Sequence, residues 1–272
     1  MPPAFPPAPL LRLPGCVLRP YHVADAAAMC ALADDPDVAR QMRDRFPHPY
    51  TAADAAEWLR IVHAEGLEEE ERKEEEEEGG KVTSGAGGPP KTSRDAIPEL
   101  YLVIGLPDGT FAGAIGLHRV GTDGTDRYTR EIGYWVGRPY AGRGLATAAA
   151  RGLARWALGV ARDDTRDDTR VAAAAAAEPG TTTPATTAAN HFPVLQRLEA
   201  NVYAANAASR RVLRRAGFVE EGVRRRAAFK YGVPTDVVML GLVASDLADG
   251  AGDGTPPLRP PVADSTTTTA AA

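Results

Sequence analysis

The chain has 272 residues and a hydrophobic fraction of 44%, enough apolar residues for a globular domain with a sizeable core. Its formal net charge of -5 comes from one acidic block, because residues 65–78 contain ten glutamates beside only Arg72 and Lys73. The sequence has no secretory signal pattern and no stretch of uninterrupted apolar residues long enough to span a membrane, so we expect a cytoplasmic protein without membrane contact.

Cysteine and histidine spacing gives no indication of a metal or disulfide site. Cys16 and Cys30 are not spaced as metal ligands or as a redox motif, so we expect free thiols in a reducing compartment. The five histidines are also scattered, which argues against a metal enzyme. They are His22, His48, His63, His118 and His191.

Four low-complexity segments divide the chain. Residues 1–15 are rich in proline, and residues 247–272 combine proline with threonine and alanine repeats, so we expect disorder at both ends. Two internal segments, at about residues 66–95 and 159–192, are an acidic block with a Gly/Pro/Ser tract and a DDTRDDTR tandem with polyalanine. We interpret both as insertions within a single domain of residues 16–246.

The remaining pieces alternate between strands and helices. Residues 16–21 form a short predicted strand, and apolar residues at helical spacing follow until Pro36, after which a second short helix starts near Asp37. Thr51 and Asp54 match a capping box at the start of another helix. Next come a hairpin with strands at 99–106 and 110–120 around a Pro-Asp-Gly turn, a strand at 129–137, a helix at 144–158, a strand at 197–203, a helix from Asn206 to Gly217, and strands at 218–230 and 236–243.

The run RPYAGRGLATAAARGLARWAL places two glycines directly before a predicted helix. A loop that enters a helix N-terminus offers unpaired N–H groups to a phosphate. A Walker loop would need a lysine after its last glycine, where this chain has Leu145, and a dinucleotide fingerprint would need Gly or Ala where it has Thr147. The sequence therefore excludes both a Walker loop and a dinucleotide-binding loop.

The sequence around this loop resembles the GNAT N-acyltransferases, and within them the branch that acetylates ribosomal-protein N-termini. EIGYWVGRPYAGRGLATAA matches the family's strand, its [QR]xxGx[GA] loop and the following helix, except that Ala141 stands at the first loop position. NAASRRVLRRAGF fits the family's NxxSxxxLxxxGF pattern, and residues near both ends of the domain are also similar. The resemblance implies an α+β fold with a mostly antiparallel, mixed sheet of six to seven strands, splayed at the cofactor site and flanked by helices.

The resemblance also implies that acetyl-CoA is the cosubstrate. The acceptor would be a primary amine, on a peptide or protein N-terminus or a small molecule, and it would attack the thioester directly. The oxyanion would be held by a main-chain N–H near Trp135 or Val136. The implied cofactor-binding residues are Tyr134, Trp135, Val136, Ala141, Gly142, Arg143, Gly144, Leu145, Ala146, Thr147, Asn206 and Ser209.

By the same resemblance Glu131 is the expected base, acting through water. A peptide α-amino group has a pKa of about 7.7–8 against about 10.4 for lysine, so an N-terminal acceptor needs only modest help. Many relatives protonate the leaving thiolate with a tyrosine at the position of Leu213. With that tyrosine absent, Ser209 or Tyr203 could replace it, or the thiolate could leave unprotonated.

Two other functions remain open from the sequence. A non-catalytic CoA-binding or interaction module is compatible with the missing tyrosine and the long insertions. A nucleic-acid-binding role for the basic stretch from Arg197 to Lys230 is disfavoured, because its basic residues lack interleaved aromatics for base stacking. The expected partners are acetyl-CoA and an amine, in a monomer or homodimer.

Overall fold

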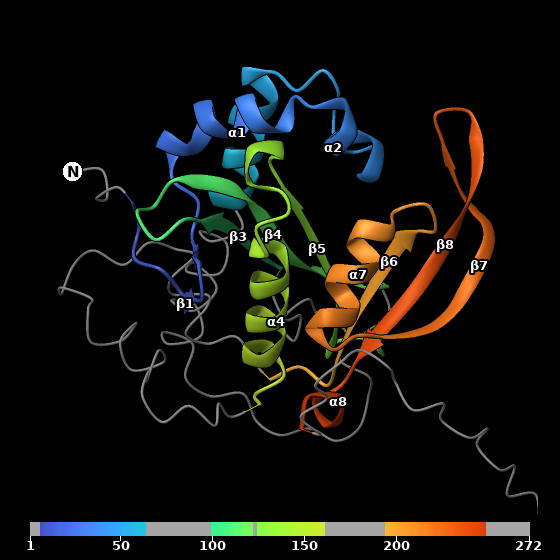
Figure 1. Ribbon diagram of the computed structural model, residues 1–272. Helices are drawn as coiled ribbons and strands as arrows, with labels where there is room; N and C mark the ends of the chain where they lie inside the picture. Colours follow the sequence, from blue (N-terminus) through green and yellow to red (C-terminus); the bar gives the residue numbers. More distant parts are fainter. Residues whose placement is uncertain (1–5, 64–98, 122–123, 161–193, 249–272) are drawn as a thin grey trace, which may run out of the picture.

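The computed structural model describes residues 6–63, 99–121, 124–160 and 194–248. Their centre is one open eight-stranded sheet with the order β1-β2-β3-β4-β5-β6-β8-β7 (Figure 1). The sheet therefore has one strand more than the six to seven that were expected. The additional strand is β1 (Leu11–Leu13), which pairs with β2 (Cys16–Arg19) and corrects the expectation of disorder throughout residues 1–15.

Most neighbouring strands in the sheet run antiparallel, as expected. The exception is the pair β5 and β6, which runs parallel, so the sheet is mixed. The Pro-Asp-Gly turn joins β3 to β4, and Tyr231 and Gly232 separate the two long final strands. The strand bounds are β3 Leu100–Gly105, β4 Phe111–Arg119, β5 Thr129–Val136, β6 Arg197–Tyr203, β7 Val219–Lys230 and β8 Val233–Leu242.

The predicted helices all form, with shifted ends. Thr51 and Asp54 cap the helix of residues 52–63 through hydrogen bonds in both directions, and the Asn206 side chain accepts from the Ser209 amide at 3.0 Å to cap α7. The helix α8 extends slightly past the predicted domain end at residue 246. The bounds are η1 Val23–Asp25, α1 Ala26–Ala33, α2 Pro36–Gln41, η3 Arg138–Tyr140, α4 Leu145–Ala157, α7 Ala207–Ala216 and α8 Ala244–Ala248.

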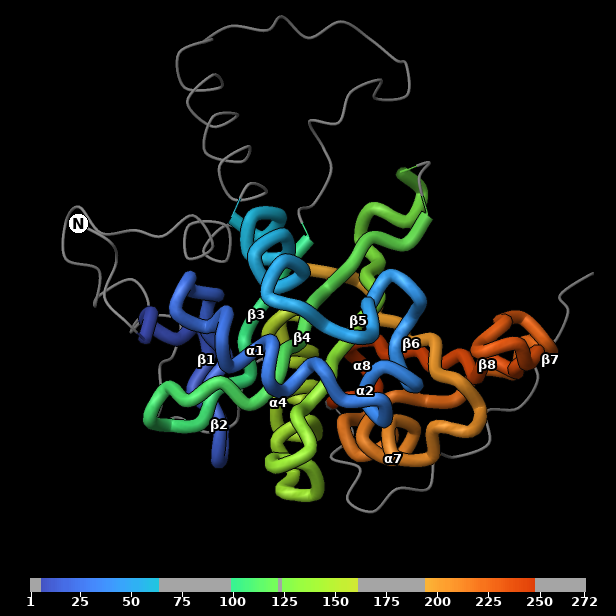
Figure 2. The backbone as a smooth tube through the Cα atoms, turned by 90° about the horizontal axis from the view of Figure 1, so that it is seen from above, coloured from blue at the N-terminus to red at the C-terminus, as the bar shows by residue number. Residues whose placement is uncertain are grey.

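Helices cover both faces of the sheet, and each face has its own core. Figure 2 shows α4 and α7 on one side and the helix of residues 52–63 on the other. Alternation along β3 explains the division, since Leu102 and Ile104 pack toward α4 whereas Val103 packs toward Met29 of α1 and Leu59. Each strand therefore presents different side chains to the two faces.

The sheet separates between β5 and β6, as expected for the family. The two strands pair only through Thr129, Arg130 and Glu131, whose partners are Arg197, Leu198 and Glu199. Beyond Glu131 the rest of β5 has no partner on its β6 side. A strand edge left open inside a sheet leaves backbone N–H and C=O groups available to a ligand.

A buried ion pair fixes the segment that leads from β2 into the first helix. Arg19 and Asp25, each with a side chain only 1% exposed, form two hydrogen bonds of 2.6 and 2.8 Å. Arg19 also donates to the Gly109 carbonyl at 3.1 Å, and Asp25 accepts from the His22 amide. This network joins η1 to the β3–β4 turn.

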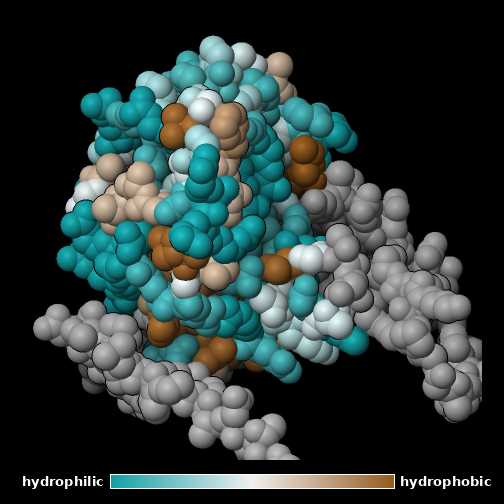
Figure 3. All heavy atoms as spheres, turned by 90° about the vertical axis from the view of Figure 1, so that its right-hand side faces the viewer, coloured by the Kyte–Doolittle hydropathy of each residue, from teal (hydrophilic) through white to brown (hydrophobic). Residues whose placement is uncertain are grey.

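The β7–β8 hairpin projects beyond the helices at the right of Figure 1. It carries the exposed apolar residues Val223, Phe229, Tyr231 and Val233. The face that includes β7 is otherwise mainly hydrophilic, with hydrophobic residues in small separate groups (Figure 3).

Most of the two expected insertions lies outside the described residues, as does nearly all of the expected C-terminal tail. Cys16 and Cys30 are free thiols, as predicted. Within the described part of the chain, no helix has the length and apolar character needed to cross a bilayer.

Candidate active site

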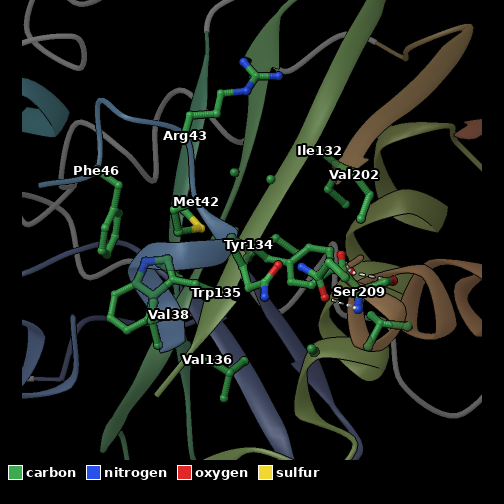
Figure 4. Close-up of a pocket in the computed structure, with 18 of the residues that line it drawn as sticks. Val38, Met42, Arg43, Phe46, Ile132, Tyr134, Trp135, Val136, Val202 and Ser209 are labelled. Atoms are coloured by element: carbon green, nitrogen blue, oxygen red, sulfur yellow. Dashed lines mark hydrogen bonds between the residues drawn. The ribbon is translucent and has the colours of Figure 1, made fainter. Parts of the chain in front are cut away.

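A cleft of about 1520 Å3 runs through the opening between β5 and β6. Its lining comes from both faces of the sheet: from α2 and the loop after it, from β4 and β5, from the glycine loop, and from β6 and α7. Figure 4 shows Tyr134 and Ser209 at one side of β5 and Arg43 and Phe46 at the other. A ligand in the opening can therefore be reached from both faces.

The glycine loop forms one wall of the cleft. Gly142 and Gly144 have φ values of 74° and 82°, in the left-handed region that favours glycine. A Cβ atom at either position would meet no atom within 4 Å, so packing does not explain these glycines. Gly144 is the N-cap of α4 and makes no side-chain cap, which leaves the first-turn amides of the helix available to an anion.

The open edge of β5 supplies a further donor. The Gly137 amide donates to Ala112 of β4 at 2.8 Å. Consecutive residues of a strand point their N–H groups to opposite neighbours, so the Val136 amide points away from β4 and into the opening. Of the two expected oxyanion donors, Trp135 and Val136, this alternation favours Val136.

Tyr134 and Ser209 meet across the opening. The Tyr134 hydroxyl lies 2.8 Å from Ser209 Oγ and donates to the Ser209 carbonyl at 3.2 Å (Figure 4). Burial raises the pKa of Tyr134 to about 12, although the hydrogen bond with Ser209 opposes the rise. The phenol therefore stays protonated at neutral pH and is able to donate.

Glu131 lies on the opposite face of the sheet, at the point where the strands separate. Its side chain is only 14% exposed and forms an ion pair with Arg43, from the loop after α2. Its register partner on β6 is Glu199, whose pKa is raised by burial and by the Glu131 charge, although Arg197 opposes this rise. A carboxylate here can attract a cationic amine.

Aromatic side chains line the cleft on the Glu131 face. The rings of Phe46 and Trp135 meet edge to face with centroids 5.8 Å apart, and those of Trp58 and Tyr101 meet at 5.0 Å. Trp58 both packs against the core and lines the cleft.

All but one of the site residues expected from sequence line this cleft. Arg143 is the exception: its guanidinium lies over the Tyr140 ring, 5.7 Å from the centroid. Leu213 is 1% exposed in the core, so no hydroxyl replaces the missing tyrosine at that position. The expected residues that line the cleft are Glu131, Tyr134, Trp135, Val136, Ala141, Gly142, Gly144, Leu145, Ala146, Thr147, Tyr203, Asn206 and Ser209.

The acetyltransferase (GNAT) domain family matches residues 16–219, well over half of the chain. The chain belongs to this GNAT family. Its open sheet, with the glycine loop between β5 and α4, is the fold that the resemblance implied. The described residues contain no group of three or more His, Cys, Asp or Glu side chains that could hold a metal ion.

One curated relative is itself named as a ribosomal N-acetyltransferase. The chain is 30% identical over 138 residues to "Putative ribosomal N-acetyltransferase YdaF" of Bacillus subtilis (strain 168), an alignment that covers 51% of this chain and 56% of the relative. The chain thus spans little more than half the length of that curated protein.

Two solved structures share the fold at lower identity. Mycobacterium smegmatis RimJ, in complex with CoA-disulfide, has 24% identity and a TM-score of 0.53, covering 91% of this chain and 92% of that one. Spermidine N-acetyltransferase from Vibrio cholerae, in complex with CoA and spermine, has 15% identity and a TM-score of 0.53, covering 87% and 99%. At these identities the likeness establishes the fold.

Sequence reasoning missed two residues beside Glu131. Arg43 follows a short helix in an irregular loop, so no periodic signal placed it near β5. His118 lies directly opposite Glu131 on β4. Counting residues back from the turn between these two strands could have found His118.

Proposed function

We propose that this GNAT protein is an N-acetyltransferase that moves the acetyl group of acetyl-CoA to a primary amine by direct attack within a ternary complex. The observation that carries the proposal is the opening between β5 and β6, which brings the glycine loop, a free backbone donor and a carboxylate to one cleft. RimJ with CoA-disulfide and spermidine N-acetyltransferase with CoA and spermine share this fold, which supports a CoA ligand and an amine acceptor.

The glycine loop fits the pyrophosphate of the cosubstrate. Backbone amides from Gly142 to Thr147 would hold the phosphates at the positive end of the α4 dipole. The Val136 amide would stabilise the oxyanion that forms when the amine attacks the thioester carbon. Ala141 stands where the family pattern has Gln or Arg, so that longer side chain is missing at the start of the loop. The backbone donors remain.

Glu131 is the proposed acceptor-side base, through water. Glu131→Gln keeps the shape of the side chain and removes its charge, so we expect turnover to fall mainly below about pH 8, where an α-amine is protonated. The check is the pH profile of kcat/KM for the variant and the wild type. An unchanged profile would remove Glu131 from the mechanism.

Ser209 is the proposed proton donor to the leaving thiolate, with Tyr134 holding its hydroxyl. We expect Ser209→Ala to reduce kcat on the order of tenfold, while KM for acetyl-CoA changes little, because only the departing sulfur gains a proton from this group. Tyr203→Phe is the matched control, since Tyr203 was the other hydroxyl expected from sequence. A larger effect from Tyr203→Phe would reverse the assignment.

Release of free thiol from acetyl-CoA tests the proposal across a panel of amines: peptides with a free α-amino group, spermine and lysine. We expect thiol release that depends on at least one of them and equals the acetylated amine formed. Acetyl-CoA binding without turnover on any acceptor would instead support a non-catalytic CoA-binding module, a function that the buried Leu213 favours.

A further inference from the structure

The His118 side chain lies beside Glu131, in a space that two glycines leave open. Gly116 and Gly133 pair across β4 and β5, two residues along from the pair His118 and Glu131, on the same face of the sheet. A Cβ at Gly133 would lie 3.1 Å from His118 Nε2, and one at Gly116 would lie 3.4 Å from Cε1. The imidazole therefore lies on two glycines, and a side chain at either position would crowd it.

The His118 ring has an unsatisfied nitrogen within the cleft wall. Nδ1 is buried and has no hydrogen-bond partner among the described residues, while the ring packs against Tyr101 with centroids 5.4 Å apart. Trp58, from the helix of residues 52–63, also packs against Tyr101 and adds no charge. Buried polar groups without a partner are rare, and a catalytic role is one of the explanations for such a group.

We propose that His118 is the final acceptor of the amine proton, which reaches it through Glu131. The inference rests on the proposed function and adds a second group to its acceptor side. Side chains directly opposite on antiparallel strands lie about 4.5–5.5 Å apart at Cβ, a spacing at which one water can carry a proton from a carboxylate to an imidazole.

The proton balance is simple. One N–H bond of the bound ammonium breaks, and its proton passes over Glu131 to an imidazole nitrogen, leaving the amine lone pair free. That pair forms the new N–C bond, the C–S bond breaks, and its electron pair leaves on sulfur. The thiolate takes a proton from Ser209, and the second proton of the amine nitrogen restores the Ser209 hydroxyl. The imidazolium later releases its proton to solvent.

The charges around His118 allow the ring to accept a proton and to release it again. Burial and the nearby Arg45 and Arg43 charges lower the pKa of His118, whereas Glu99 and Glu131 oppose the fall. The ring is thus neutral near pH 7 and able to accept a proton, and the charges of Glu99 and Glu131 stabilise the imidazolium once it forms. Arg43 also forms the ion pair with Glu131.

The test is the pH profile of kcat/KM for His118→Gln with the best acceptor among peptide α-amines, spermine and lysine. For an α-amine acceptor we expect a loss on the order of tenfold at pH 6.5 and less than about twofold at pH 9, where the amine is already neutral. His63→Gln, at a histidine outside the cleft, is the control. The double variant with Glu131→Gln should lose no more than the worse single variant, because both groups serve one path.

A second variant guards against a purely structural effect. His118→Ala should recover part of its activity at pH 6.5 when free imidazole is added, since the glycine pair leaves space for the ring. An equal loss at every pH with no imidazole rescue would show a packing role and overturn the proton path. If the wild type acetylated none of the amines, both the proposed function and this inference would fall, whereas wild-type turnover with an unshifted His118→Gln profile would overturn the inference alone.

Discussion

Gly144→Asp should reduce acetyl-CoA affinity by at least about 100-fold while the protein remains folded. The new carboxylate would stand at the N-cap of α4, where the pyrophosphate is expected, and like charges about 4 Å apart repel by roughly 4 kcal/mol at the edge of a protein. Open space around the Gly144 Cβ position means that the side chain itself meets no atom. Isothermal titration with acetyl-CoA measures the change.

Two control variants separate charge from backbone strain. Gly144→Asn puts a neutral side chain of the same shape at the same φ of 82°, which Asn and Asp both tolerate, so its loss of affinity should be far smaller. Gly124→Asp puts the same charge at a glycine with φ of 84° and open space, outside the cleft, and should leave affinity unchanged. Equal affinities for Gly144→Asp and wild type would refute the loop assignment.

Asp25→Ala should lower the free energy of unfolding by about 3–5 kcal/mol, the usual result of removing one partner from a buried ion pair. Arg19 would keep its bonds to the Pro20 and Gly109 carbonyls but lose both bonds to the carboxylate. The His22 amide would also lose its acceptor. Urea denaturation followed by tryptophan fluorescence gives the free energy directly.

Glu57→Ala is the matched control for Asp25→Ala. Glu57 also binds an arginine, Arg60, through two hydrogen bonds, but both side chains are more than half exposed. Exposed pairs contribute little, so the free energy of unfolding should stay nearly unchanged. Similar losses from the two variants would show that burial of the Arg19–Asp25 pair is not what makes it stabilising.

The segments around the glycine loop were predictable because local chemistry specifies them. Glycines before an alanine-rich run indicate a loop that enters a helix, and Asn206 with Ser209 three residues later indicates an N-cap. The resemblance of two separate segments to one family then placed the loop and the cap on the same cleft. The structure agrees at each of these positions.

Long-range placement was harder to predict. β1 was missed because proline-rich composition indicated disorder, although Leu11 packs into the core at 3% exposure. Arg143 was expected to bind the cofactor because of its position in the loop, and its orientation over Tyr140 depends on packing that spacing does not specify. Arg43 and His118 belong to neither the loop nor the cap, and only the register of the sheet and the path of the α2 loop bring them to Glu131.

Leu213 differs from the family pattern, and a tyrosine from another strand lies close to the same helix. Leucine fills the core where the family resemblance led us to expect a tyrosine, yet a different tyrosine, Tyr134 on β5, reaches Ser209 on the same helix. The cleft therefore retains a phenol and a hydroxyl in hydrogen-bond contact. This pair supplies the proposed proton donor, in addition to the groups that the opening between β5 and β6 brings together.

Transfer of an isotopically labelled acetyl group tests the central claim most directly. The protein is mixed with labelled acetyl-CoA, alone and with the amine panel, and both the protein and the amines are weighed by mass spectrometry. Direct attack predicts a labelled amine formed in step with free CoA, and no label on the protein at any time. Saturable acetyl-CoA binding without a labelled amine, or a labelled protein that precedes the product, would contradict it.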